Sequence, residues 1–125
     1  MVKTMKRGLS LMFVLSLLVS MLAIPAKATN GSKSVTVGLG HNTEYVTVYT
    51  DKSFLGLKKT TITITNNSKS RTISLHKGYA DEGELGPGKS KTISVKANGA
   101  TYSFVVQSSW GSGNASVNFS IKNGY

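Results

Sequence analysis

The stretch Thr61-Ile62-Thr63-Ile64-Thr65 decides the fold of this chain. Successive side chains of a β-strand point to opposite faces, so the alternation places Ile62 and Ile64 together on one face. Both residue types are β-branched and favour extended backbone. The stretch therefore predicts a strand with one face in an apolar core and the other face in solvent.

The same period of two recurs along the chain. It is found in residues 34–37, 45–49, 72–76, 92–96, 102–106 and 117–121, which brings the number of predicted strands to seven. In each of them one face is apolar and the other carries threonine, serine, tyrosine or lysine. This pattern is typical of antiparallel sheets that are packed on one side. No segment after residue 28 has a convincing helical period.

Turn residues separate the predicted strands. Residues 66–70 form a polar turn, and Asn98-Gly99 predicts a hairpin, because both residue types accept a positive φ. Glycines and Pro87 interrupt a long connection over residues 78–88. Seven short strands with turns between them predict an all-β fold, an antiparallel sandwich of two sheets.

One part of the chain resembles a known class of domain. The sequence Leu85-Gly86-Pro87-Gly88-Lys89-Ser90-Lys91-Thr92-Ile93-Ser94-Val95 is similar to a hairpin corner of bacterial immunoglobulin-like and fibronectin-like modules. In those modules an Asn-polar-Ser turn often precedes the corner, as Asn66-Asn67-Ser68 does here. The resemblance covers about residues 60–96 and implies an immunoglobulin-like β-sandwich, not an activity. The disulfide and tryptophan hallmark of antibody domains is absent, since the chain has no cysteine.

The first 28 residues have the pattern of a secretory signal peptide. Lys3, Lys6 and Arg7 precede an apolar stretch over residues 8–24, and the small residues of Ala26-Lys27-Ala28 follow. We expect cleavage between Ala28 and Thr29, which would release a β-sandwich domain of residues 29–125 outside the cell or at its surface. The alternative is an uncleaved membrane anchor, but an anchor needs about 20 apolar residues and this stretch is interrupted by serines.

The charge of the expected mature domain suggests an anionic partner. Four basic residues would leave with the signal peptide, so 11 basic residues remain beside five acidic ones, a net charge of +6. Such a domain is attracted to teichoic acids, acidic polysaccharides and anionic membranes. Its lysines are scattered along the chain, which does not indicate specific nucleic-acid binding. We assign the electrostatic contribution to Lys58, Lys59, Lys89 and Lys91.

Four aromatic residues are candidates for ligand binding. Trp110 is the only tryptophan and lies in a glycine-rich loop, where an aromatic ring can stack on a sugar or close one end of the core. Tyr45 and Tyr49 share the strand face opposite Val46 and Val48. If the valines face the core, these tyrosines lie outside and can extend a binding face with Tyr79; in the opposite register they are core residues. We favour the outer position.

Catalytic and metal-binding patterns are not evident in the sequence. Residues 81–84 concentrate three of the five acidic residues, but their spacing differs from that of a regular calcium loop, and a solvated turn is the default interpretation. His41 and His76 have no metal-ligand spacing. The chain lacks the sequence motif of a catalytic nucleophile or zinc protease. We therefore expect no enzyme activity, no metal and no cofactor.

These observations predict a secreted, disulfide-free β-sandwich that binds an anionic cell-wall polymer or a polysaccharide. Two other classes remain open. The first is a secreted antimicrobial or toxin-like factor, and the second is an inhibitor of an extracellular hydrolase that presents the connection 78–88. A structural role in an extracellular matrix is a weaker possibility, which rests on the threonine- and isoleucine-rich strand. The sequence leaves the oligomeric state open.

Overall fold

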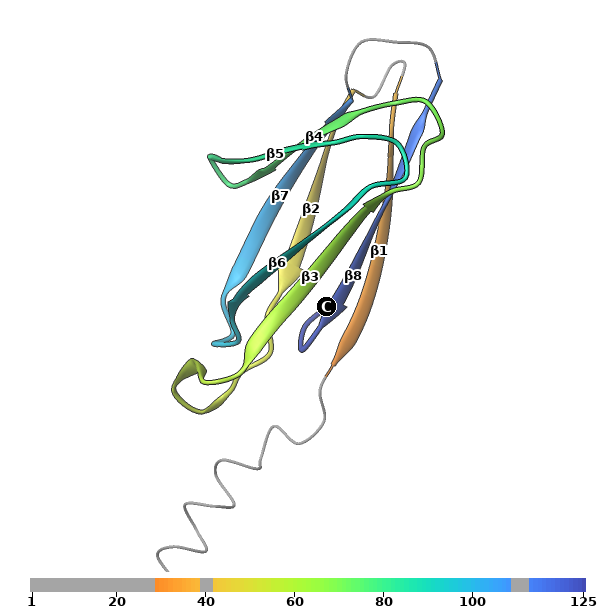
Figure 1. Ribbon diagram of the computed structural model, residues 1–125. Coiled ribbons are helices and arrows are strands. Elements are labelled where there is room, and N and C mark those ends of the chain that lie inside the picture. Colours follow the sequence, from red (N-terminus) through yellow and green to blue (C-terminus); the bar gives the residue numbers. More distant parts are fainter. Residues whose placement is uncertain (1–28, 39–41, 109–112) are drawn as a thin grey trace, which may run out of the picture.

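Two four-stranded antiparallel sheets lie face to face in the computed structural model, which describes residues 29–38, 42–108 and 113–125 (Figure 1). Sheet I has the strand order β1 (Asn30–Val37), β8 (Ala115–Lys122), β3 (Lys59–Asn66) and β6 (Ser90–Lys96). Sheet II has the order β2 (Thr43–Tyr49), β7 (Thr101–Ser108), β4 (Ile73–Lys77) and β5 (Ala80–Leu85). A single 3-10 turn, η1 (Phe54–Gly56), interrupts the described strands between β2 and β3. The predicted all-β sandwich is confirmed.

The strand pairs are nested. β1 pairs with β8, β2 with β7, β3 with β6 and β4 with β5, as if one long hairpin were folded over on itself. This is the connectivity of an eight-stranded jelly roll. The resemblance to immunoglobulin-like modules therefore holds at the level of the two-sheet sandwich, whose strands are connected differently here.

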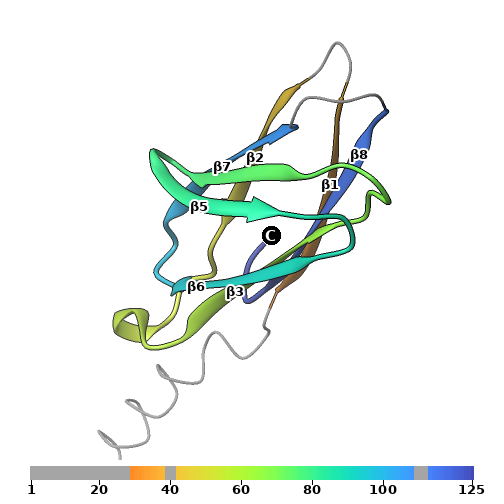
Figure 2. The same cartoon turned by 45° about the horizontal axis from the view of Figure 1, so that its top comes forward.

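Two local predictions need correction. The connection 78–88 contains β5, an additional edge strand that the sequence analysis missed because its residues are acidic or small and only Leu85 is buried. Figure 2 shows the chain leaving β5, turning, and returning along β6 in the opposite sheet. Asn98-Gly99 is not a hairpin turn, because β6 and β7 belong to different sheets. Gly99 does have the expected positive φ, of 80°.

The core lies between the sheets and follows the predicted alternation. Ile62 and Ile64 of β3 are fully buried, and so are the rings of Phe104 and Phe119, whose centroids lie 5.7 Å apart. The described strands and core residues all lie within residues 29–125. The predicted signal peptide, residues 1–28, lies outside the described residues. Within the described part, no helix has the length and apolar character needed to cross a membrane.

A buried amide joins the two motifs on which the resemblance was based. The side-chain nitrogen of Asn66 donates hydrogen bonds to the carbonyls of Arg71, Leu85 and Gly86, at 2.7, 3.0 and 3.2 Å. Its side-chain oxygen accepts one from the amide of Ser68 at 3.0 Å. The Asn-Asn-Ser turn and the Leu-Gly-Pro-Gly corner are therefore linked in space through one side chain.

Lysines close both open sides of the sandwich. On one side, Lys33 of β1 donates to the carbonyl of Thr47 on β2. On the other side, Lys91 of β6 forms an ion pair of 3.2 Å with Glu82 of β5, and Lys77 of β4 lies 4.0 Å from the same carboxylate. Charged side chains that point inward from edge strands protect a sheet against pairing with another chain.

The C-terminal residues lie between β1 and β2. Tyr125 and Tyr49 exchange backbone hydrogen bonds of 2.6 and 2.8 Å, and Gly124 forms bridges with Asn30 and Thr50. Gly124 is buried so closely that a Cβ atom there would lie 2.4 Å from the carbonyl oxygen of Tyr49. The end of the chain therefore connects an edge of sheet I to an edge of sheet II.

Candidate functional site

A row of polar side chains crosses the outer face of sheet II. Thr43 of β2 is the register partner of Gln107 on β7, Gln107 is the partner of Ser74 on β4, and Ser74 is the partner of Glu84 on β5. We call these four residues the polar row. Adjacent strands lie about 4.8 Å apart, so the polar row extends about 14 Å across the sheet.

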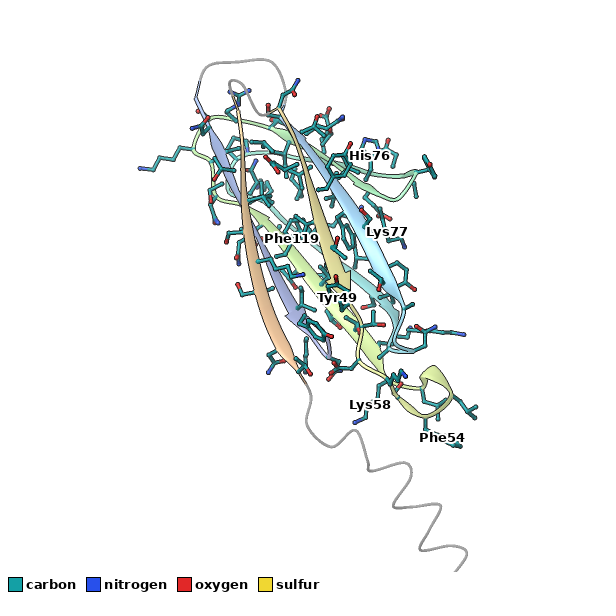
Figure 3. The ribbon with its side chains drawn as sticks, turned by 180° about the vertical axis from the view of Figure 1, so that it is seen from behind. Tyr49, Phe54, Lys58, His76, Lys77 and Phe119 are labelled. Atoms are coloured by element: carbon teal, nitrogen blue, oxygen red, sulfur yellow. The ribbon has the colours of Figure 1, made fainter. Side chains whose placement is uncertain are left out.

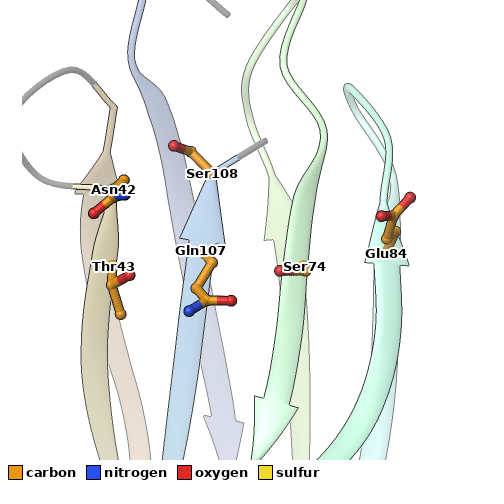
Figure 4. Close-up of a pocket in the computed structure, with 6 residues that line it drawn as sticks. All are labelled: Asn42, Thr43, Ser74, Glu84, Gln107 and Ser108. Carbon is orange, nitrogen blue, oxygen red and sulfur yellow. The ribbon is translucent and has the colours of Figure 1, made fainter. Parts of the chain in front are cut away.

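The polar row lines a hollow of about 240 Å³ together with Asn42 and Ser108 (Figure 4). Its lining presents two amide groups, three hydroxyls and one carboxylate. Amides and hydroxyls both donate and accept hydrogen bonds, and an ionised carboxylate accepts them. Most pockets for small apolar ligands are lined by hydrophobic side chains. This hollow instead suits a ligand that carries many hydroxyl groups.

Tyr45 lies beside the polar row. It follows Thr43 by two residues on β2, so both side chains are on the outer face of sheet II. Val46 and Val48 are buried in the core, whereas Tyr45 is 69% exposed. Its register partner on β7 is Val105, which in turn is opposite His76 on β4. The site therefore combines a hydrogen-bonding row with an exposed aromatic ring in the next row.

Tyr49 faces outward as well, but its ring has partners within the molecule. It stacks on Tyr125, with ring centroids 5.1 Å apart and planes 22° apart. The ammonium nitrogen of Lys33 lies 5.1 Å from the centroid of the Tyr49 ring. Tyr45 and Tyr49 are separated by about 13 Å along the strand. The ring of Tyr49 is thus engaged in contacts at the edge where the two sheets meet, whereas the ring of Tyr45 is exposed beside the hollow.

The remaining aromatic candidates lie elsewhere. Tyr79 is fully exposed at the tip of the hairpin between β4 and β5. Trp110 lies outside the described residues. The chain on either side of its loop is held by the buried Arg71, whose guanidinium donates to the carbonyl of Gly113 and to the hydroxyl of Ser108, the latter at 3.3 Å.

The four lysines assigned to electrostatic attraction do not form one patch. Lys58 and Lys59 precede and begin β3, at the end of the molecule that holds η1. Lys89 lies at the opposite end of β6, about 23 Å along the strand from Lys96, the register partner of Lys59. Lys91 is engaged with Glu82. We therefore expect from them a distributed positive field and not a single basic patch.

The acidic segment 81–84 does not converge on a metal site. Asp81 accepts a hydrogen bond of 2.8 Å from the amide of Gly83, Glu82 points inward to the lysines, and Glu84 belongs to the polar row. Among the described residues, no group of three potential metal ligands comes together. His76 lies on the outer face of sheet II, and His41 lies outside the described residues.

Sequence analysis missed the polar row and one further group, the exposed hydrophobic residues of 54–57. The polar row could not be found from the sequence, because it exists only through the register of four strands. Residues 54–57 could have been found from the sequence. Phe54-Leu55-Gly56-Leu57 is an apolar run outside any alternating pattern, and Lys52, Lys58 and Lys59 flank it.

Comparisons with known proteins found little. No family model matches the chain, and no curated protein matches it. Among solved structures, the pre-peptidase C-terminal domain of a collagenase from Bacillus anthracis is similar, with 16% sequence identity and a TM-score of 0.49. The similarity covers 74% of this chain and 88% of that domain.

Proposed function

We propose that residues 29–125 form an exported, non-catalytic domain that binds a hydroxyl-rich polysaccharide of the cell envelope on the outer face of sheet II. The observation that carries this proposal is the polar row beside Tyr45. A sugar ring offers an apolar C–H face and a rim of hydroxyls. The ring of Tyr45 suits the first, and Gln107 and Glu84 suit the second.

The extent of the site favours a polymer. The polar row crosses all four strands of sheet II, so neighbouring units of a chain can lie along it. The positive net charge adds long-range attraction to an anionic envelope, and this attraction weakens as salt screens it. Lys58, Lys59 and Lys89 would contribute most of this attraction. Lys91 would contribute less, because it forms an ion pair with Glu82.

Binding without hydrolysis is the activity that the hollow supports. Glycoside hydrolysis usually requires two carboxyl groups about 5–10 Å apart on either side of the scissile bond. Of the six described residues that line the hollow, only Glu84 carries a carboxyl group. Its role would be to accept hydrogen bonds from sugar hydroxyls.

Export is supported by the position of the first strand. β1 begins at Asn30, one residue after the expected new N-terminus, and the Thr29 nitrogen donates a hydrogen bond of 2.9 Å to the carboxylate of Asp51. Cleavage after Ala28 would turn that amide into an ammonium group and the contact into a charge-assisted one. The alternative of a hydrolase inhibitor loses its long presenting loop, since residues 80–85 are the strand β5.

Cosedimentation of residues 29–125 with purified bacterial cell walls that carry teichoic acids tests the proposal. We expect retention of the parent protein, about tenfold weaker binding of Tyr45→Ala, and several-fold weaker binding of Gln107→Ala. Ser94→Ala, on the outer face of sheet I, is the control and should bind like the parent. Tyr79→Ala examines whether the hairpin tip contributes. Equal binding of the Tyr45→Ala, Gln107→Ala and Ser94→Ala variants would rule out this face as the site.

A further inference from the structure

The loop between β2 and β3 exposes hydrophobic side chains at one end of the molecule. Leu55 is 79% exposed and Leu57 is 69% exposed, and Phe54 is also exposed. Figure 3 shows Phe54 beyond the ends of the strands, pointing away from both sheets. We call residues 54–57 the apolar tip. Single exposed hydrophobic residues are ordinary, but a cluster on a projecting loop marks an interaction site.

The apolar tip is held in a defined shape. The amides of Gly56 and Leu57 donate to the carbonyls of Ser53 and Phe54, at 3.1 and 3.0 Å. The Ser53 hydroxyl donates to the carbonyl of Ala97 and accepts a hydrogen bond from the amide of Lys58. The base of the loop is thus fixed to the connection between β6 and β7, so little ordering is needed when the tip meets a partner.

The backbone of Leu55 is strained. Its φ of 53° and ψ of 22° lie in the left-handed region, which glycine and asparagine adopt easily and leucine does not. The exposed Leu55 side chain adds nothing to the core that would offset this cost. Strain that the fold retains at an exposed position is a feature of functional sites.

Five lysines lie beside the apolar tip in the sequence or at the end of sheet I next to it. We call Lys52, Lys58, Lys59, Lys96 and Lys122 the lysine collar. Lys59 and Lys96 are direct register partners, and Lys122 is the partner of Thr61 in the next outward-facing row. The Cβ of Lys96 lies 3.7 Å from the position that a Cβ on Gly56 would take. Like charges directly opposite each other on a sheet are unfavourable, and an anionic partner would relieve this repulsion.

Acidic residues are largely kept away from this end. Asp51 is near the apolar tip, and it accepts the hydrogen bond from the Thr29 nitrogen. Glu44 lies next to Thr43 at the other end of β2, and the remaining three acidic residues lie on β5. Asp51 is therefore the one described acidic side chain at the end of the molecule that carries the apolar tip.

We propose that the apolar tip inserts into the interface of an anionic lipid bilayer while the lysine collar contacts the headgroups. Hydrophobic side chains that penetrate to the acyl boundary, with lysines at headgroup level, are the combination that holds peripheral proteins on anionic membranes. A stable protein partner usually needs more than about 1,200 Å² of interface, which a convex four-residue loop does not offer. The tip lies at the opposite end of β2 from the polar row, so the proposed membrane contact does not use the polar row, whereas Lys58 and Lys59 would add attraction to either anionic partner.

Vesicle cosedimentation of residues 29–125 tests the proposal. We expect binding to vesicles of equal parts phosphatidylglycerol and phosphatidylcholine, and at least tenfold weaker binding to phosphatidylcholine alone. Added salt should weaken the binding but leave a residual part, since screening acts on the lysine collar and not on the apolar tip.

Matched variants separate insertion from simple charge attraction. Leu55→Asn combined with Leu57→Ser keeps every charge and relieves the strain at position 55, and it should lower binding at least tenfold through lost apolar burial. Lys59→Gln should lower binding about fivefold, on the anionic vesicles only. Tyr79→Ser removes a fully exposed ring from the hairpin between β4 and β5, outside the apolar tip, and should have no effect.

Three outcomes would overturn the proposal. The first is no binding to the anionic vesicles at low salt. The second is unchanged binding of the Leu55→Asn, Leu57→Ser variant, which would indicate adsorption by charge alone. The third is a dimer of the parent protein, by analytical ultracentrifugation, that this double variant dissolves, which would assign the apolar tip to a second copy of the chain. Loss of cell-wall retention would not bear on any of the three.

Discussion

Asn66 is a fully buried amide whose side chain acts on three segments at once. It accepts a hydrogen bond from the Ser68 amide within its own turn. It also donates hydrogen bonds to the carbonyl of Arg71, just before β4, and to that of Leu85, at the end of β5. Its backbone also forms hydrogen bonds with Gly88 and Lys89 of the corner. If one of these hydrogen bonds were lost, a buried polar group would be left without a partner and would carry a desolvation cost. The side chain of Asn66 therefore holds the segments that connect the two sheets in one arrangement.

We expect Asn66→Ala to lower the free energy of unfolding by about 2–3 kcal/mol, because it leaves the Ser68 amide and several carbonyls without their partner. Chemical denaturation of residues 29–125 measures this change. Asn67→Ala alters the exposed neighbour in the same turn and should change the stability by less than about 0.5 kcal/mol. Equal effects of the two variants would contradict this role of Asn66.

At the scale of elements, the edge strands depend on their inward charges. β5 and β6 are the last strands of their sheets on one side, and Glu82 and Lys91 meet across the gap between them. The side chain of Lys91 also donates to the backbone carbonyl of Glu82. The ion pair is partly exposed and contributes little stability, so its main effect is to keep these edges from pairing with another molecule.

We expect Lys91→Val to leave the free energy of unfolding within about 1 kcal/mol of the parent value while promoting association through the edges of β5 and β6. Light scattering over a range of protein concentrations measures the association. Lys89→Val removes the same charge from the exposed turn before β6 and serves as the control. Equal association of both variants would show that net charge, not the edge, is responsible.

At the scale of the whole molecule, the end of the chain joins the two sheets. The fit of Gly124 against Tyr49 and Thr60 leaves no room for a side chain. The stacked rings of Tyr49 and Tyr125 cover this junction from outside. The stability of the sandwich therefore depends on its last residues.

Gly124→Ala should destabilise the domain by about 2–3 kcal/mol through overpacking. Thermal and chemical denaturation both report the change. Gly86→Ala is the matched control, since a Cβ at that position would meet its nearest neighbour, Lys89, at an ordinary 3.8 Å. A Gly124→Ala variant as stable as the Gly86→Ala variant would mean that the C-terminal residues are not essential to the closure.

Alternation was enough to predict the sandwich and the outward position of Tyr45 and Tyr49, because burial on one face imposes a period of two. It did not predict β5, whose residues gain order mainly by pairing with β4 and not by burial. It misassigned Asn98-Gly99, since a favourable turn dipeptide does not specify whether the chain stays in one sheet. These failures share a cause, which is that local preference does not encode which strands become neighbours.

The candidate sites also differ in how much of each can be predicted from local sequence. The polar row depends on the register of four strands that are distant in sequence, so no local pattern reveals it. The apolar tip is readable from the sequence, but only its exposure and the neighbouring Lys96 and Lys122 turn an apolar run into a candidate membrane contact. The charge of residues 81–84 predicted an acidic turn, whereas pairing turned Glu82 inward and Glu84 outward.

The nested pairing also bears on how the protein is made. β1 lies at the edge of sheet I and its partner there is β8, the last of the described strands. During translation the first strand must wait until β8 has been made, so the strands that precede β8 cannot complete sheet I by themselves. Because this pairing closes a loop of nearly the whole domain, we expect sheet I to be completed later than the local pairing of β4 with β5.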